Sequence, residues 1–554
     1  HIWYTSGQLQ DWISSHLKTP DWIEGLLRST RFFLGAARIF TTWAFISFRK
    51  HTLEEDSRLK EKCAASALEL ICSLKGYYVK AAQTLCGAGL FPVEFNEAFA
   101  VLLDQCPKEP YSEVCKIIES ELRCKIDDVF MDFQEEAIAA ASIGQVHFAS
   151  LKDGTQVAVK VQYPEVERYF AMDVQTVGFL MGIIGMGSKV KDVFKTMQDQ
   201  FETEFDFTRE ATFMKECAQN VLPIYKDRIA IPLPVDGDHP GCPQPVAKTL
   251  CSRKILTMER LDGTPIRQHT IKLLESFASQ LGSTVEEMKE LMNTTDASKI
   301  DNLENEKLKQ FINMGPISEG ASFAARLAIR IRNTSARALR FCIGPCHCAP
   351  CESIRPRLKP LAVPLNGPRI SKLLFDVHGH EIFQNGLFNS DPHAGNVFMM
   401  KDGRLGLIDY GAVMRLSKEQ RISIAKLFVA IADEDDDAVP GAFWACGFKS
   451  KKMDPRMALL LAHLSFNRGP WPADIQRLAP KVGLPEDADL MDIEAYMRNG
   501  KVDEIDEFPG HLVLLQRCCM VLSGLGMEMG AGRLSSAGML RAQAAKLLEQ
   551  EGLL

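Results

Sequence analysis

The sequence predicts an α+β fold in two lobes, and three observations predict it. Residues 53–85 place apolar side chains at helical spacing, residues 138–163 alternate β-forming side chains around a hairpin turn, and the chain from about residue 421 onward is again helical in pattern. Helices, then strands with a helix, then helices are the order typical of folds that segregate the two kinds of element. With 554 residues, 46% of them hydrophobic, the chain can bury a large core.

The first part of the chain, residues 1–135, is expected to be a helical extension. A second helix is expected over residues 111–122. The apolar stretch 32–48 contains Arg38 and falls short of the roughly 18 uninterrupted apolar residues that a membrane-spanning helix needs. We expect it to be an amphipathic helix packed on the protein's own core, with contact to a membrane surface as the alternative. The apolar positions in residues 53–85 that share one helical face are Leu59, Cys63, Leu70, Leu74 and Tyr78.

Strands begin in the second part, residues 136–260. Valines and other β-forming residues flank "KDGT", a hairpin signal, and the second strand of this hairpin carries Lys160. A long charged helix is expected over residues 194–220, and "KILTMERLDGTPI" (254–266) reads as an apolar strand that leads into a polar turn. The third part, residues 261–554, is expected to form a helical lobe.

The stretch "DPHAGNVFMMKDGRLGLIDYG" (391–411) lies in this third part and carries three groups suited to phosphoryl transfer. That reaction needs a carboxylate to orient the acceptor and oxygen ligands for Mg²⁺. Asp391, Asn396 and Asp409 supply these groups, in the order and spacing of a kinase catalytic loop followed by an aspartate before glycine. A lone Asp-Tyr-Gly is usually a turn, so the inference depends on the ordered set.

A kinase also needs a lysine on a strand and a glutamate on a helix to hold it. "VAVK" places Lys160 where the phosphate-contacting lysine of kinases lies. In "EFDFTREA", Glu210 is the favoured partner because it lies on the next helix, while Glu204 and Asp206 are competitors. An exposed lysine on a strand and a solvated charged helix are the structural alternatives.

The glycine-rich loop of ordinary kinases is absent before the lysine strand. Ala139, Ala140, Ala141 and Ser142 stand at that position. Glycines allow backbone N–H groups to approach phosphates at positive φ, and alanines restrict that freedom. We therefore expect these residues to hold a nucleotide in a different way.

The motifs together resemble the UbiB-type atypical kinases, also called aarF-domain kinases, which are associated with ubiquinone biosynthesis and lipid homeostasis. They are, in order, "AAASIGQVHFA", "VAVKVQYP", "EFDFTREA", "MERLDG", "DPHAGN" and "IDYG", and the similarity covers roughly residues 55–295 and 370–530. The resemblance implies a protein kinase-like fold in which the alanine-rich loop replaces the glycine-rich loop. It also implies that Lys160 and Glu210 pair, while Asp391, Asn396 and Asp409 form the catalytic and metal set.

The family's Lys-x-Gly-Gln motif lies on an N-terminal helix that folds over the active site. Here it corresponds to "KAAQ", from Lys80 to Gln83, with Ala82 in place of glycine, so close packing of this helix on the nucleotide lobe is in question. Glu204 and Asp206 match the family's Glu-x-Asp motif, which the resemblance implies interacts with the extension or with metal.

The resemblance implies use of ATP or ADP with Mg²⁺, either for phosphoryl transfer to a small or lipid-like acceptor or for ATP hydrolysis coupled to isoprenoid lipids. Expected partners are an isoprenoid-like small molecule, a membrane surface and a lipid-biosynthetic complex. A nucleotide-binding scaffold without catalysis and a conventional protein kinase are the alternatives. The expected location is mitochondrial and peripheral to a membrane, or else plastid, although no targeting sequence is visible.

The overall charge and the cysteines limit the partners and the compartment. A net charge of −7 gives no reason to expect a nucleic-acid partner, and sixteen scattered cysteines favour a reducing compartment.

A segment at about 296–370 departs from the kinase pattern and is expected to be an insertion. Residues 321–370 contain eight arginines and one lysine against one glutamate. The segment could be an unstructured insertion, a basic patch or a zinc site, although its cysteine spacing is not that of paired C-x₂-C knuckles. The candidate zinc ligands are Cys342, Cys346, His347, Cys348 and Cys351.

Overall fold

The computed structural model combines helices and strands, as the sequence predicts. The chain divides into two compact units, one made of His1–Lys215 with Pro232–Arg260 and the other of Glu216–Ile231 with Leu261–Leu554. The residues that the structure describes are 21–48, 53–87, 93–103, 106, 108–141, 143–163, 166–183, 204–237, 250–281, 283–284, 319–343, 365–467, 471–485, 503–532 and 534–554.

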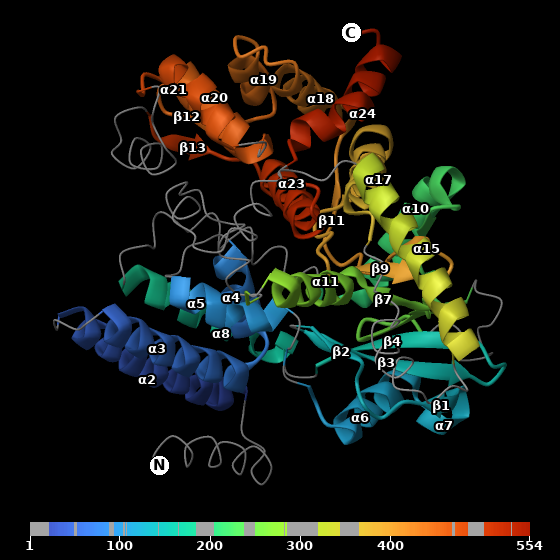
Figure 1. The fold of residues 1–554 in the computed structure, drawn as a ribbon. Coiled ribbons are helices and arrows are strands. Elements are labelled where there is room, and N and C mark those ends of the chain that lie inside the picture. Colours follow the sequence, from blue (N-terminus) through green and yellow to red (C-terminus); the bar gives the residue numbers. More distant parts are fainter. Residues whose placement is uncertain are drawn as a thin grey trace. The chain divides into compact units, whose positions relative to one another are not determined.

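Helices make up the first part of the first unit. Helix α2 (Asp21–Phe48) packs along α3 (Leu53–Leu74) and α8 (Val166–Ile183), and α2 and α3 run side by side in Figure 1. The helix expected over residues 53–85 is divided into α3 and α4, because Lys75 and Gly76 adopt left-handed φ angles of 57° and 55°. The remaining helices of this unit before its sheet are α4 (Tyr77–Gly87), α5 (Val93–Phe99), η1 (Ala100–Leu103), α6 (Tyr111–Leu122) and α7 (Ile126–Val129).

A five-stranded antiparallel sheet forms the second part of this unit. Its order is β1-β3-β4-β6, and β2 pairs with β3 beside that path. Gly154 closes the expected β3–β4 hairpin at a φ of +88°, which glycine tolerates without steric cost. Helix α6 covers the sheet through a common apolar core. The strands are β1 (Phe130–Phe133), β2 (Ala139–Ala140), β3 (Gly144–Leu151), β4 (Gln156–Gln162) and β6 (Ile255–Glu259).

Helix α10 (Phe207–Tyr225) follows in the chain, and the boundary between the two units falls within it. The sequence predicts a helix over residues 194–220, and the part of that range before residue 204 lies outside the described residues. One face of the second half of α10 is buried, since Cys217, Ala218 and Val221 are at most 2% exposed.

The second unit is mainly helical and also contains short strands. A four-stranded sheet has the order β5-β10-β9-β7, β8 pairs with β11, and β12 pairs with β13. The β12–β13 pair adds strands to a region that the sequence predicts to be helical. The strands are β5 (Ile229–Ala230), β7 (Gly263–Pro265), β8 (Leu387–Asn389), β9 (Val397–Met400), β10 (Leu405–Leu407), β11 (Val413–Arg415), β12 (Lys449–Ser450) and β13 (Ile505–Glu507).

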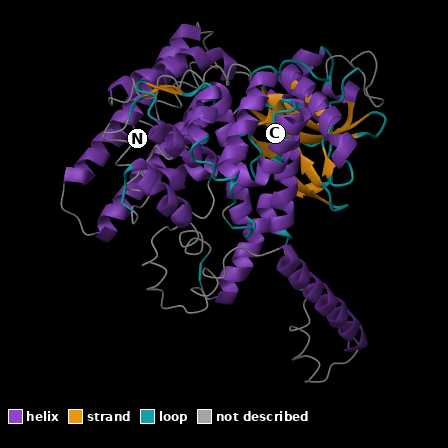
Figure 2. Cartoon of the chain, turned by 90° about the horizontal axis from the view of Figure 1, so that it is seen from above, coloured by secondary structure: helices purple, strands orange, loops and turns teal. Residues whose placement is uncertain are grey.

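The helices of the second unit form its core. Helices α18 and α24 pack against each other, and α17 contacts both α23 and α24. Figure 2, coloured by secondary structure, shows helix as the prevailing structure of the described residues. The helices are α11 (Ile266–Leu281), α15 (Glu319–Ile343), α17 (Gly367–Gly379), the π-helix η4 (His380–Asn385), α18 (Lys418–Ala432), α19 (Val439–Ala445), α20 (Pro455–Phe466), α21 (Trp471–Val482), α23 (Gly510–Glu528) and α24 (Ser536–Gln550).

Helix α23 is, among the described residues, the single helix long and apolar enough to cross a membrane by length and composition alone. Half of its apolar window is buried within the protein. It carries Arg517 and buries Cys518 and Leu522, as a core helix of a folded domain does.

Part of the range expected to be an insertion is helical. Residues 319–343 form α15, so an unstructured segment is the wrong description for them. Helix α17 begins at Gly367, where an added Cβ would lie 2.0 Å from the Met529 carbonyl oxygen, and Ile370 is buried. The four residues from Cys346 to Cys351 that were candidate zinc ligands lie outside the described residues.

Candidate active site

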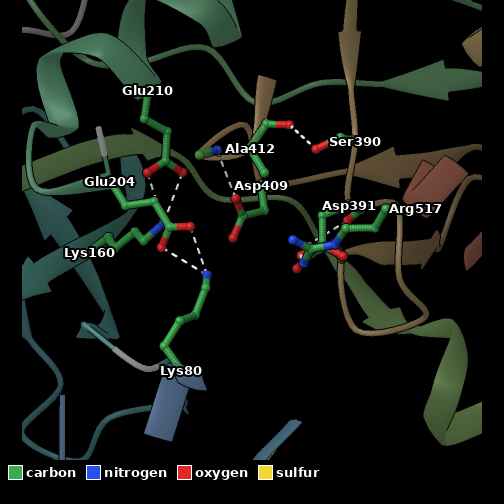
Figure 3. A network of polar contacts seen from close by, with 11 residues as sticks. Lys80, Lys160, Glu204, Glu210, Ser390, Asp391, Asp409, Ala412 and Arg517 are labelled. Atoms are coloured by element: carbon green, nitrogen blue, oxygen red, sulfur yellow. Dashed lines mark hydrogen bonds and ion pairs between the residues drawn. The ribbon is translucent and has the colours of Figure 1, made fainter. Parts of the chain in front are cut away.

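Lys160 and Glu210 form a buried ion pair in the first unit. The Lys160 Nζ donates to both carboxylate oxygens of Glu210, at 2.9 and 2.8 Å, and the two side chains are 10% and 5% exposed (Figure 3). Lys160 lies on β4 between β3 and β6, paired with Val146 and Leu256. A central strand and a helix therefore hold the two charges where water has little access.

The start of α10 is held by its own side chains and by the sheet. Asp206 Oδ1 accepts hydrogen bonds from the Thr208 backbone N–H and hydroxyl, at 3.0 and 2.5 Å, and so satisfies donors at the helix N-terminus. Gln162 Nε2, on β4, donates to the Phe205 carbonyl oxygen at 3.0 Å. These contacts set the helix in the register that directs Glu210 toward Lys160.

Glu204 pairs with Lys80 on α4 instead of with Lys160. The Lys80 Nζ lies 2.7 and 2.9 Å from the two Glu204 carboxylate oxygens, as Figure 3 shows. Gln83, one turn further along α4, donates to the Leu102 carbonyl oxygen at 2.7 Å. Of the two acidic residues in the Glu-x-Asp motif, Glu204 therefore contacts the N-terminal extension, while Asp206 caps α10.

The alanine-rich loop is tied to the sheet and to the extension. Ala139 and Ala140 form β2, and the Ala141 N–H donates to the Gly144 carbonyl oxygen at 2.7 Å. Ala140 packs against the apolar cluster that contains the buried Ala82 of α4, so the alanine in "KAAQ" is accommodated in close packing. Ser142 lies outside the described residues.

The loop that carries Asp391 and Asn396 belongs to the second unit and is braced by its own hydrogen bonds. Asn389 Oδ1 accepts from the Asp391 N–H at 2.9 Å, and Asn396 Nδ2 donates to the Asp391 carbonyl oxygen at 3.3 Å. The Ile408 N–H donates to the Asn396 carbonyl oxygen at 3.2 Å, which brings Asn396 beside the residue that precedes Asp409. Asp391, Asn396 and Asp409 are thus drawn together by β8, by the β9–β10 hairpin and by the turn after β10.

The Asp409 turn has the donor chemistry of a magnesium site. Asp409 Oδ1 accepts from the Gly411 N–H at 2.9 Å, and its carbonyl oxygen accepts from Asn389 Nδ2 at 2.5 Å. Because the Asn396 amide nitrogen is used, the amide offers its oxygen as a ligand, and Mg²⁺ prefers oxygen. The described residues contain no group of three His, Cys, Asp or Glu that could hold a metal. Such a partial set fits Mg²⁺, which commonly completes its coordination with water and phosphate oxygens.

Arg517 contacts the candidate site, and no motif in the sequence indicates it. Its Nη2 lies 2.5 Å from Asp391 Oδ2, and the two side chains are 33% and 21% exposed (Figure 3). The available signal was a lone cation within the apolar run "LVLLQRCCMVLSGLG" (512–526), since such a cation needs a partner when its helix is buried. The sequence cannot name that partner, because it is 126 residues away.

Two buried groups lie next to the Asp409 turn. Burial raises the pKa of Glu381 to about 8, against a smaller opposing effect of the hydrogen bond from the Asn389 backbone. Burial, followed by the charge of Glu381, raises the pKa of Tyr410 well above its ordinary value. Within the part of the chain that the structure describes, neither the Glu381 Oε2 nor the Tyr410 hydroxyl has a hydrogen-bond partner, so a charge on either would be costly.

A lysine strand with a paired glutamate, followed by the Asp391 loop and the Asp409 turn, is the organisation of a kinase-like fold. Residues 101–294 and 359–442 match the model of the ABC1 atypical kinase-like domain. These two segments cover half of the chain, so the protein belongs to the ABC1 atypical kinase-like family, and the predicted relationship to UbiB-type, or aarF-domain, kinases is confirmed.

Curated relatives of this chain are also named as kinases. The Arabidopsis thaliana protein ACTIVITY OF BC1 COMPLEX KINASE 1, chloroplastic, is 24% identical over 70% of this chain and 43% of its own. Atypical kinase COQ8B, mitochondrial, from Rattus norvegicus is 31% identical over 38% of each chain. AarF domain-containing protein kinase 1 of Xenopus tropicalis is 35% identical over 27% of this chain and 30% of its own. The chain thus spans less than half the length of each of these relatives.

Proposed function

We propose that this chain binds ATP or ADP with Mg²⁺ and acts as an atypical kinase or ATPase of the UbiB type. Its acceptor would be a small or lipid-like molecule, or its ATP hydrolysis would serve the handling of isoprenoid lipids in ubiquinone biosynthesis or lipid homeostasis. The observation that carries the proposal is the buried Lys160–Glu210 pair, together with the braced set of Asp391, Asn396 and Asp409.

Each residue has a role in this proposal. Lys160 contacts the phosphates while Glu210 holds its ammonium in place, and the loop from Ala139 to Ser142 covers the nucleotide. Asp409 and Asn396 bind Mg²⁺, which neutralises phosphate charge when it is bound, and Asp391 orients the acceptor or a water molecule.

The Lys80–Glu204 pair supports an atypical kinase over a conventional protein kinase. It fastens the helix that bears the "KAAQ" motif to the segment just before α10, and Ala140 packs on the same cluster as Ala82. We propose that Lys80, Gln83 and Glu204 regulate access to the site by holding the extension in place, and that Asp206 contributes by fixing the start of α10 next to Glu204. Generic protein substrates would then be poor acceptors.

A membrane surface is the proposed location of the lipid-like acceptor. Apolar side chains on α2 and α8 are exposed: Leu26, Leu34, Phe40, Phe45 and Phe179. Exposed apolar side chains of this kind favour binding to an apolar surface. With relatives named mitochondrial and chloroplastic, we propose an organellar, peripheral location, mitochondrial in the first instance and plastid as the alternative.

The test is Mg²⁺-dependent nucleotide binding and turnover, with and without liposomes that contain quinone-like lipids. Lys160→Met and Glu210→Gln should each weaken nucleotide use, and the double variant should lose no more than the stronger single one, because the residues act as a unit. Additive losses would contradict the pairing. Binding without turnover would indicate a scaffold for a lipid-biosynthetic complex, and phosphorylation of generic proteins would indicate a conventional kinase.

The measurement of liposome binding has its own control variant. Phe40→Ser with Phe45→Ser should reduce liposome binding severalfold, because both side chains are more than half exposed on α2. Met131→Ser changes an equally exposed apolar residue on β1 and should leave liposome binding unaltered. An equal effect of both changes would remove α2 from the membrane proposal.

A further inference from the structure

Helix α10 carries a second ion pair, six residues beyond Glu210. Glu216 accepts two hydrogen bonds from the Arg415 guanidinium, Nη1 to Oε1 at 2.9 Å and Nη2 to Oε2 at 2.6 Å. This two-point arrangement fixes the direction of approach as well as the distance, which a lysine ammonium would not do.

The two glutamates lie on different sides of α10. In an α-helix, six residues correspond to about 9 Å along the axis and about 120° around it. The Lys160–Glu210 pair and the cap at Asp206 fix the helix near its N-terminus only. A second pair on another side, with Cys217, Ala218 and Val221 buried between neighbours, opposes rotation of the helix about its axis.

Arg415 occupies a strand that depends on the Asp409 turn. It ends β11, six residues after Asp409, and pairs with Leu387 of β8, the strand that leads to Asp391. The Ser390 N–H and hydroxyl both donate to the Ala412 carbonyl oxygen at 2.8 Å, which fastens this strand to the Asp391 loop. The position of Arg415 therefore follows the conformation of the segment after Asp409.

We propose that Arg415 is a positioning residue that, through Glu216, holds α10 in the rotation that keeps Glu210 on Lys160. This inference rests on the proposed function for its effect on nucleotide. Conventional kinases commonly use a phosphorylated activation segment to hold the corresponding helix. In this chain Arg415, which is always charged, holds the helix instead of a phosphorylated residue. The active position of α10 therefore needs no phosphorylation, but it requires an ordered Asp409 turn.

The two Arg415 and Glu216 side chains are 58% and 34% exposed, so their contribution to overall stability is small. What distinguishes the Arg415–Glu216 pair from an ordinary surface ion pair is that it restricts the rotation of α10. The Lys449–Glu507 pair, 2.7 Å apart with side chains 57% and 54% exposed, is a matched control on β12 and β13.

The first experiment is hydrogen exchange of the nucleotide-free protein, read on the backbone amides of residues 207–215. Arg415→Met should raise exchange there at least threefold, and Lys449→Met should not. The double variant Glu216→Arg with Arg415→Glu swaps the two charges and should restore most of the protection against hydrogen exchange. An unchanged hydrogen-exchange rate in Arg415→Met, or no recovery of protection in the charge-swapped double variant, would overturn the proposal whether or not the chain binds nucleotide.

The second experiment measures nucleotide affinity in two backgrounds. Arg415→Met should weaken Mg-ATP binding two- to fivefold in the wild type and leave it unchanged when Glu210 is already Gln, because Arg415 acts through Glu210. An equal loss in both backgrounds would overturn this route. Failure of the proposed function would look different, since the wild type would then not bind nucleotide while the exchange result remained.

Discussion

Arg517 on α23 donates from Nη2 to Oδ2 of Asp391 at 2.5 Å, so a core helix of the second unit fixes the carboxylate of the predicted catalytic loop. The contact holds Asp391 from the side, while Asn389 and Asn396 fix its backbone. The orientation of the Asp391 carboxylate is thus set by the protein itself, and in the proposed function this lowers the reorganisation needed for reaction.

Arg517→Met should reduce turnover about tenfold and change nucleotide affinity less than twofold, because misplacing a catalytic group costs rate more than binding. Single-turnover rates and nucleotide titrations on the same preparation separate the two effects. Gln516→Met, on the neighbouring residue of α23, should leave both unaltered. A variant with wild-type turnover would show that Asp391 needs no such orientation.

Asp409→Asn should weaken Mg-nucleotide binding at least severalfold, because it removes a charge that stabilises the metal. Asp391→Asn should leave binding largely intact and lower turnover. Titrations at several Mg²⁺ concentrations check both expectations. Asp402→Asn changes an exposed carboxylate in the same β9–β10 hairpin and serves as the control. Mg²⁺ dependence that Asp409→Asn does not change would remove Asp409 from the metal site.

Glu381 should make the protein less stable as pH rises through the neutral range. Its folded-state pKa of about 8 is above the ordinary 4.5, so between these values the folded protein keeps a proton that the unfolded chain releases. Stability therefore falls from about pH 4.5 to about pH 8 and is level outside that window. From pH 5 to pH 7 the loss is on the order of 2 kcal/mol.

Glu381→Gln removes this titration and should flatten that part of the profile. Urea midpoints of both proteins, measured from pH 5 to pH 8, should diverge in favour of the variant as pH rises. Profiles that stay parallel would mean that Glu381 is ionised in the folded protein.

Deleting residues 296–358 should leave the protein folded and able to bind nucleotide. The family match skips residues 295–358, and shortening a long connection changes closure entropy little. The buried positions of α15 among the described residues are small or polar, so little apolar burial is lost: Ser322, Asn333 and Ala336.

Extending the deletion to residue 370 should abolish soluble expression. Asn366 caps α17 by accepting from the Arg369 N–H, and the following Gly367 packs against the Met529 backbone. Soluble yield and the melting temperature compare the two deletions. Equal soluble yield and equal melting temperature for the two deletion variants would mean that the insertion does not end before residue 359. Zinc bound at one ion per chain and released by Cys346→Ser would instead favour the metal-site alternative for this segment.

Much of the candidate site could be predicted because its residues lie in short motifs with fixed local geometry. A hairpin turn before "VAVK" places Lys160 on a strand, and the spacing from Asp391 to Asp409 is the length of a loop and one hairpin. The mixed helix and strand class follows from the change of hydrophobic period along the chain. The break of the predicted 53–85 helix has a signal in Gly76, but a single glycine inside a helical pattern does not by itself mark an end, and Lys75 adopts a positive φ although it is not a glycine.

The sequence by itself determined which groups are available: a lysine strand, three acidic residues before and within α10, and the Asp391, Asn396 and Asp409 set. Only the tertiary structure decided their partners. It paired Glu210 with Lys160, Glu204 with Lys80 and Arg517 with Asp391, and it used Asp206 as a cap. The physical reason is that the partners in these ion pairs are 50 to 126 residues apart in the sequence. Tertiary packing, and not local spacing along the chain, sets the distance between them in space.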